Sequence, residues 1–160
     1  MASTSTNKQP LLIDRVLYES VPCNTLTSGS DTSLDITGTN ESVVLVNCTS
    51  NDGALIEDLF VIARSTTAYT ALFYMSPAID YLRANQAVFV GDITSATTVG
   101  AFSSVTALPS VLAPVPAVGS NPKNQALYIP RGKALWVTLQ TVNPLNSSAT
   151  PIAGVQGGYY

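Results

Sequence analysis

The stretch from Glu41 to Met75 constrains the fold most, because it holds three closely spaced apolar segments separated by turn residues. Asn51-Asp52-Gly53 lies between the first two segments, and Asp-Gly supplies the positive φ that a tight hairpin needs. A short polar link, Ser65-Thr66-Thr67, separates the second from the third. The pattern predicts three consecutive antiparallel strands at the centre of a β-sheet core. These segments, rich in Val, Leu, Ile, Phe and Tyr, are Ser42–Cys48, Leu55–Ala63 and Tyr69–Met75.

Further short apolar segments, punctuated by turn residues, continue this pattern. Leu34–Thr37 alternates apolar and polar residues, and a strand is expected again at Val88–Val90 and Ile93, where Gly91 permits a bend or a bulge. Thr94–Ser104 predicts a weak strand or an exposed loop. The clearest hairpin after the central segments joins Ala126–Ile129 to Ala134–Val142 through Pro130-Arg131-Gly132-Lys133.

The strand pattern as a whole indicates the fold class. About eight short strands, with no self-similar period, predict an all-β, single-domain β-sandwich or jelly-roll-like barrel. One short helix is expected at Ser76–Arg83, because Ser76 suits an N-cap and Pro77 the first helical position.

The first 22 residues are expected to form an extended N-terminal arm ahead of a β-sandwich domain at residues 23–160. Met1–Gln9 is small and polar, without periodicity. Leu11–Glu19 is apolar enough for an extended segment. Pro10 before it and Val21-Pro22 after it favour an arm or an edge strand over a short helix.

Composition argues against catalysis and against several partners. Charged residues make up 11% of the chain, there is no His, and the net charge is −3 without a basic cluster. The commonest general base and the imidazole zinc site are therefore missing, as is the electrostatic footprint of a nucleic-acid groove. No apolar run is long enough for a membrane-spanning helix. The chain is expected to be a non-enzyme without cofactor or metal, binding neither nucleic acid nor membrane.

The remaining reactive side chains favour structural roles. Glu57 and Asp58 are adjacent on an expected strand and so point to opposite faces; one of them is expected to pair with Arg64 or Arg83. For the two cysteines, Cys23 and Cys48, buried free thiols are favoured over a disulfide.

A weakly charged surface rich in Ser, Thr and Asn suits permanent packing against neighbours, because these side chains lose little entropy when immobilised. The proline-rich stretch Leu108–Pro122 is apolar for a loop, and either lies on its own sheet or docks on a neighbouring chain. Trp136 is either an exposed interface anchor or a core residue of the second sheet. The candidate interface residues are Leu11, Leu12, Ile13, Val16, Leu17, Val111, Leu112, Val115, Trp136, Tyr159 and Tyr160.

Several runs along the chain resemble small virion structural proteins of tailed phages that infect marine cyanobacteria. The runs are NKQPLLIDRVL, DGALIEDLFVIARSTTAYT, DYLRANQAVFVG, LAPVPAVGS, LYIPRGKALW and GVQGGYY. The resemblance implies a β-rich virion subunit, assembled in the host cytoplasm and present in many copies. A capsid decoration (cement) protein that grips the head shell through its termini and loops fits best. Its partners would be the major capsid protein or other virion subunits, and a homo-oligomer, such as a trimer, is expected.

Two alternatives stay open. A tail, collar or fibre-base component of the virion could have the same fold and composition. A non-catalytic carbohydrate-binding β-sandwich could stack a sugar on exposed Tyr or Trp rings, with Trp136 as the residue to test.

Overall fold

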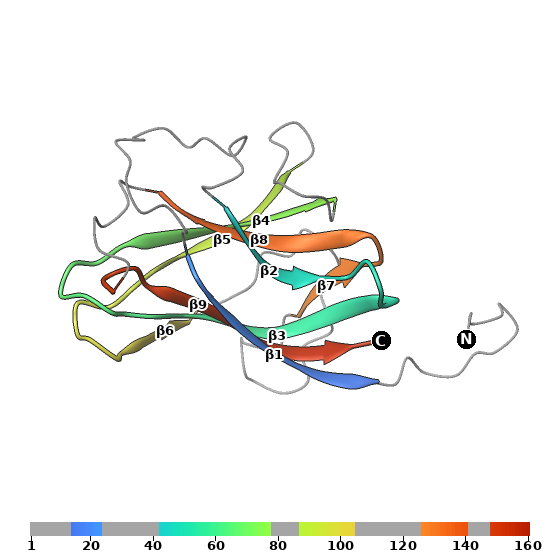
Figure 1. Cartoon of the computed structure of the whole chain (residues 1–160), viewed down its shortest axis with the longest axis horizontal. Coiled ribbons are helices and arrows are strands. Elements are labelled where there is room, and N and C mark those ends of the chain that lie inside the picture. The colour runs from blue at the N-terminus through green and yellow to red at the C-terminus, as the bar shows by residue number, and fades with distance from the viewer. Residues whose placement is uncertain (1–13, 24–41, 78–86, 105–125, 141–147) are drawn as a thin grey trace, which may run out of the picture.

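Two antiparallel β-sheets face each other across one hydrophobic core (Figure 1). The computed structural model describes residues 14–23, 42–77, 87–104, 126–140 and 148–160. In this part of the chain, sheet A has the order β1-β9-β3-β6, with β7 also paired to β3, and sheet B has the order β2-β8-β4-β5. The strands are β1 (Arg15–Pro22), β2 (Val43–Asn47), β3 (Gly53–Ile62), β4 (Thr70–Pro77), β5 (Val88–Thr94), β6 (Phe102–Ser104), β7 (Leu127–Pro130), β8 (Lys133–Leu139) and β9 (Ile152–Tyr159).

The three central strands form where expected, but their predicted pairing is wrong. β2 lies in sheet B, β3 in sheet A and β4 in sheet B again, so the chain crosses the sandwich at each connection. Each strand has the same alternation of buried and exposed side chains whether it pairs with its sequence neighbour in a hairpin or lies in the facing sheet. The two arrangements differ only in where the linker leads the chain, so the alternation does not distinguish them. The Asp52-Gly53 turn therefore sends the chain to the facing sheet.

The predicted hairpin at 126–142 is wrong for the same reason. β7 pairs with β3, whereas β8 lies between β2 and β4 in the other sheet. Gly132 has a φ of 78°, which favours glycine, and the turn it forms again connects the two sheets.

Strand β5 pairs with β4 and contains the irregularity that Gly91 suggested. Phe73 is opposite Gly91 and Tyr74 is opposite Phe89, so Val90 is the extra residue of a bulge. The expected short helix is not confirmed: Ser76 and Pro77 belong to β4, and residues 78–86 lie outside the described ranges. Pro77 is the last residue of that strand and is paired with Lys133 of β8.

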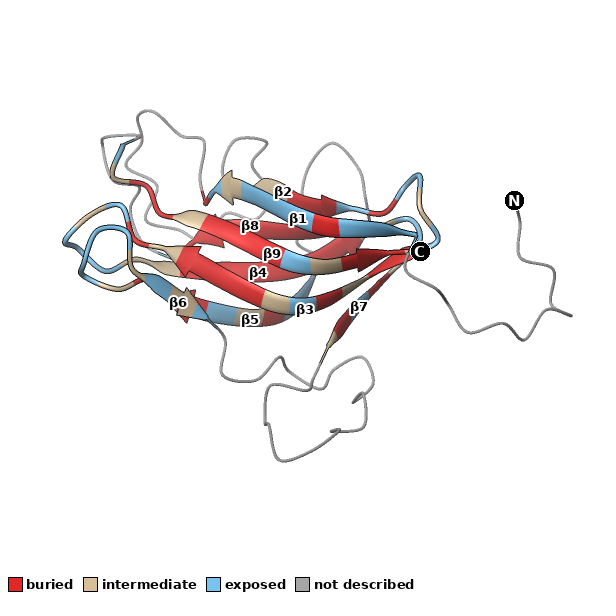
Figure 2. Ribbon diagram, turned by 90° about the horizontal axis from the view of Figure 1, so that it is seen from below, coloured by how far each residue is buried: buried red, intermediate tan, exposed pale blue. Residues whose placement is uncertain are grey.

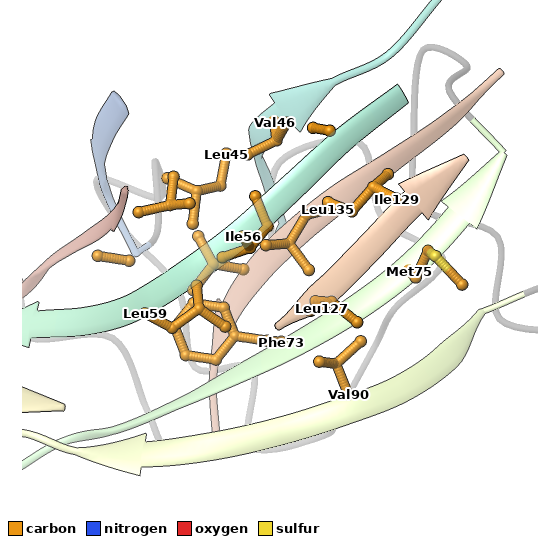
Figure 3. Packing of buried hydrophobic residues seen from close by; sticks show 14 of the residues in the cluster. Leu45, Val46, Ile56, Leu59, Phe73, Met75, Val90, Leu127, Ile129 and Leu135 are labelled. Atoms are coloured by element: carbon orange, nitrogen blue, oxygen red, sulfur yellow. The ribbon is translucent and has the colours of Figure 1, made fainter. Parts of the chain in front are cut away.

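The main core is built from the inward faces of both sheets (Figure 3). Phe73, Ile56 and Leu135 are fully buried, and each contributes about 1.5–3 kcal/mol by leaving water. Figure 2 shows this burial as red stretches toward both ends of β9 and β3, interrupted by exposed and half-buried residues in the middle of each strand, with β1 mostly exposed beside them.

Part of the predicted N-terminal arm belongs to the sandwich. Residues 15–22 form β1, which pairs along its whole length with β9, and Leu17 is fully buried in the core. Of the alternatives weighed for this segment, the edge strand is confirmed. Residues 1–13, the expected strand at 34–37 and the proline-rich stretch 108–122 lie outside the described residues.

Strand β9 is the strand that the sequence pattern did not indicate. It lies between β1 and β3, and its glycines permit close packing. A Cβ at Gly154 would overlap the ring of Phe60, and a Cβ at Gly157 would overlap the carbonyl oxygen of Leu55. Glycine is therefore favoured at both positions by the neighbouring strand, most strongly at Gly157, where the obstacle is backbone.

Candidate functional site

An aromatic row crosses the outer face of sheet A. It consists of Tyr18 on β1, Phe60 on β3 and Phe102 on β6. The ring centroids of Tyr18 and Phe60 are 6.3 Å apart, and those of Phe60 and Phe102 are 5.6 Å apart. These distances fall in the range of favourable tilted ring pairs, so the three side chains support one another.

The backbone explains why Phe60 points outward. A bulge between Ile56 and Asp58 changes which residues of β3 face the core, so that Leu59 points inward and Phe60 outward. Phe60 is directly opposite Gly154, and its ring lies over that glycine. The middle ring of the row is thus only 6% exposed and held in place.

The two ends of the row are open to solvent. Tyr18 is 64% exposed and Phe102 is 66% exposed, and Val16 beside Tyr18 is 75% exposed. Ile62 and Ile152, paired with each other, add two half-buried side chains to this face. Charge is sparse on it, with the half-buried Asp58 opposite the exposed Gln156. Such an apolar face, with rings that support one another, is typical of a contact surface.

A pair of tyrosines lies on β7 and directly after β9. The rings of Tyr128 and Tyr160 are 6.5 Å apart, and the Tyr128 hydroxyl donates to the carbonyl oxygen of Asp52 at 3.3 Å. The nearby ion pair between Arg131 and Asp52, at 3.4 Å, joins two exposed side chains and adds little stability.

The structure places the predicted interface residues in three different situations. Val16 is exposed, and Tyr160 is partly exposed. Leu17, Trp136 and Tyr159 are buried within their own chain. The remaining predicted residues, Leu11, Leu12, Ile13, Val111, Leu112 and Val115, lie outside the described residues.

Of the two alternatives for Trp136, the structure shows the buried residue of the second sheet and not the exposed anchor. It is 3% exposed and packs with Leu72, Tyr74 and Ala134 in a smaller cluster on sheet B. Among the described residues, its indole N–H has no hydrogen-bond partner, and neither does the buried hydroxyl of Ser42. A ring this buried cannot stack on a sugar, so Trp136 is not the residue through which a carbohydrate would bind.

The titratable groups of the described residues contain no cluster of three or more His, Cys, Asp and Glu side chains that could hold a metal ion. Glu57 is exposed at the bulge of β3 and Asp58 is half-buried; neither forms an ion pair with Arg64, and Arg83 lies outside the described ranges.

Both thiols are free and buried, as expected. Burial raises the pKa of Cys23 from 9.0 to about 12, partly offset by a hydrogen bond to the backbone of Ala153, and burial raises the pKa of Cys48 to about 11. Cys23 follows the Pro22–Ile152 pair, while Cys48 interacts electrostatically with Tyr159 at the other end of β9. Opposite ends of that strand are roughly 20 Å apart, too far for a disulfide.

The sequence did not indicate the aromatic row. In β1 the alternation of Val16 and Tyr18 with Leu17 was visible, but its outward face could be assigned only once the strand was placed. Phe60 stood in a uniformly apolar run, and only the bulge decides which way it points.

Comparison with known proteins gave no match, either to a family model or to a curated protein or solved structure. In the described part of the chain, no helix has the length and apolar character needed to cross a membrane. The fold and the aromatic row therefore define the class of protein by themselves: an all-β sandwich of two antiparallel sheets with an apolar outer face.

Proposed function

We propose that this chain is a non-enzymatic structural protein of a phage virion that decorates the head shell, with the outer face of sheet A as its contact surface. The observation that carries the proposal is the aromatic row, whose ends at Tyr18 and Phe102 are open to solvent. The resemblance of the sequence runs to virion proteins of cyanobacterial phages supports the virion location.

The physical argument starts from the rings. Full burial of an aromatic side chain removes about 150–250 Å² from water, so two rings that are two-thirds exposed offer on the order of 250 Å² of apolar area. Phe60 between them is already ordered by Gly154, so docking immobilises few additional side chains. Interface centres are enriched in aromatic residues and depleted of charge, as this face is.

The partner that fits is an apolar patch on a capsid subunit, rimmed by polar groups. Only 11% of the residues are charged, and a surface of short hydroxyl side chains around the row can pack against such a rim at low entropic cost. Termini and loops outside the described residues would add to this contact. A jelly-roll-like arrangement of the strands and a short helix remain predictions.

The direct test is the position and copy number of labelled protein on particles. Hundreds of copies on the head shell are expected, whereas a ring at one vertex would indicate tail, collar or fibre-base machinery. Replacing Phe102 with Ser should lower occupancy on the shell. The matched control is Phe89→Ser, which alters an aromatic ring that is 48% exposed on sheet B. Equal occupancy of both variants would reject the aromatic row as the contact surface.

Two further measurements separate the alternatives. A truncation that tests the arm must end at residue 13, because residues 15–22 form β1 and their loss would damage sheet A. If that truncation binds particles with unchanged occupancy, residues 1–13 do not clamp the shell. Binding to a glycan array that is lost with Tyr18→Ala would instead favour the carbohydrate-binding alternative.

A further inference from the structure

Strand β1 is an exposed edge. Six of its eight residues are exposed, and within the described residues it pairs with β9 alone. The N–H of Cys23, directly after the strand, donates to the carbonyl oxygen of Pro151 at 2.9 Å. Because backbone groups alternate in direction along a strand, those of Leu17 and Glu19 point toward β9 and those of Val16, Tyr18 and Ser20 point away from it.

The side chains of β1 have an order that suits pairing with themselves. Arg15 and Glu19 lie two residues on either side of Leu17, on the same face of the strand, and both are exposed. Val16 and Tyr18, 75% and 64% exposed, lie one residue on either side of it on the outer face. When a second β1 runs in the opposite direction about Leu17, the position of Arg15 therefore meets that of Glu19, and the position of Val16 meets that of Tyr18.

We propose that two copies of this chain associate through antiparallel pairing of β1 with β1, about a two-fold axis at Leu17. Arg15 of each copy then lies opposite Glu19 of the other, and Val16 opposite Tyr18. The outward-pointing N–H and C=O groups of Val16 and Tyr18 complete hydrogen bonds with those of the second copy. Arg15 and Glu19 form the non-hydrogen-bonded pairs, in which side chains are closer together. This inference goes beyond the proposed function and does not rest on it.

Neighbouring registers are less favourable. Moving the axis to Tyr18 places Glu19 opposite Leu17 of the other copy, and moving it to Val16 places Arg15 opposite Leu17. Moving it to Glu19 brings two carboxylates directly opposite each other, which is destabilising. The axis at Leu17 is the one among these that joins opposite charges.

The geometry also sets the number of copies. Pairing of a strand with itself is isologous, and it closes with two copies, whereas the trimer that the sequence allowed would need a different contact. The two sheets A would become one continuous sheet. Their aromatic rows would then lie on the same face of the dimer.

Charge reversal tests this inference on the purified full-length chain. Sedimentation equilibrium should show a dimer whose dissociation constant rises by on the order of tenfold in Arg15→Glu or in Glu19→Arg, because each symmetric pair turns from attraction into repulsion. The double variant Arg15→Glu/Glu19→Arg restores opposite charges and should return toward the wild-type constant. The control Glu57→Arg, an exposed reversal on β3, should leave dimerisation unchanged.

Mixing the two single variants gives the sharpest result. A heterodimer of Arg15→Glu with Glu19→Arg has complementary charges at both pairs, so it should form in preference to either homodimer. Circular dichroism of each variant checks that the fold is retained, because Arg15 also lies over the ring of Tyr159 at 4.6 Å. A monomeric wild-type chain at high micromolar concentration, or equal association of all variants, would overturn the proposal. Particle binding plays no part in this assay, so its outcome is separate from that of the virion role.

Discussion

Two glycines of β9 allow the packing around that strand to be tested by substitution. Gly157→Ala places a methyl group against the carbonyl oxygen of Leu55, a backbone atom of the central strand β3. Leu55 is paired with Gly158 of β9 on one side and with Tyr128 of β7 on the other, so this backbone cannot move without disturbing the pairing of β3. Gly154→Ala instead meets the far end of the Phe60 ring, which is a side chain and shifts at lower cost than backbone. The first substitution should therefore be the more damaging.

The magnitudes follow from overpacking. Inserting a methyl group into a packed site costs about 1–3 kcal/mol, so we expect a loss near 3 kcal/mol for Gly157→Ala and near 1 kcal/mol for Gly154→Ala, by the same scale. In a chain of this size, 1 kcal/mol lowers the melting temperature by about 2–4 °C. Urea unfolding followed by circular dichroism measures both losses. Gln156→Ala, an exposed change between the two glycines, is the control and should stay within about 0.5 kcal/mol of wild type.

A second variant identifies the atom responsible. Replacing Phe60 with Leu removes the ring atoms that the new methyl group meets, so the double variant Gly154→Ala/Phe60→Leu should lose less than the sum of the two single losses. The same Phe60 substitution should not relieve Gly157→Ala, whose obstacle is backbone. A loss for Gly157→Ala below that for Gly154→Ala would refute this account of the strand.

Three further predictions concern the interior. Phe73→Ala should cost about 3–5 kcal/mol in urea unfolding, whereas Phe102→Ala, on an exposed ring, should cost under about 1 kcal/mol; similar losses would contradict the assigned core. Trp136→Phe removes a buried N–H that has no partner among the described residues and also leaves a small cavity, so it should cost about 1–2 kcal/mol from the cavity alone; a loss above about 3 kcal/mol would indicate an additional lost hydrogen bond. Because the pKa of Cys23 is raised from 9.0 to about 12, its contribution to stability is complete below pH 9 and is lost as pH rises toward 12. The urea midpoint should therefore fall less steeply from pH 8 to 11 in Cys23→Ala than in the wild type, and equal slopes would refute this.

The sequence predicted the strands better than their partners. Val43–Asn47, Gly53–Ile62 and Thr70–Pro77 match the expected apolar segments to within two residues at each end. Strand formation depends on local side chains, but the choice between a hairpin and a crossing to the facing sheet depends on contacts with segments far along the chain. β9 was missed for a related reason. Three glycines weaken its local strand signal, and two of them, Gly154 and Gly157, are favoured only because Phe60 and Leu55 lie against them.

The candidate site was predicted only in part. Val16 was named as an interface residue and is exposed, while Leu17, the next residue in the same strand, is buried. The period of two in β1 predicts that these residues face opposite ways, but it does not say which way the core lies. Tyr18 and Phe102 come together with Phe60 only through the order of strands in sheet A, which no local pattern contains.

The position of β9 also sets the order of events during synthesis and folding. β1 and β3 are both made long before β9, yet β9 lies between them and supplies the hydrogen bonds that join them. Bringing β1 and β9 together closes a loop of most of the described chain, a contact of high sequence separation that slows folding. Until β9 arrives, β1 and β3 have unpaired edges that can join other chains. We expect refolding yield to depend on protein concentration, because strand addition between incomplete molecules competes with the late insertion of β9.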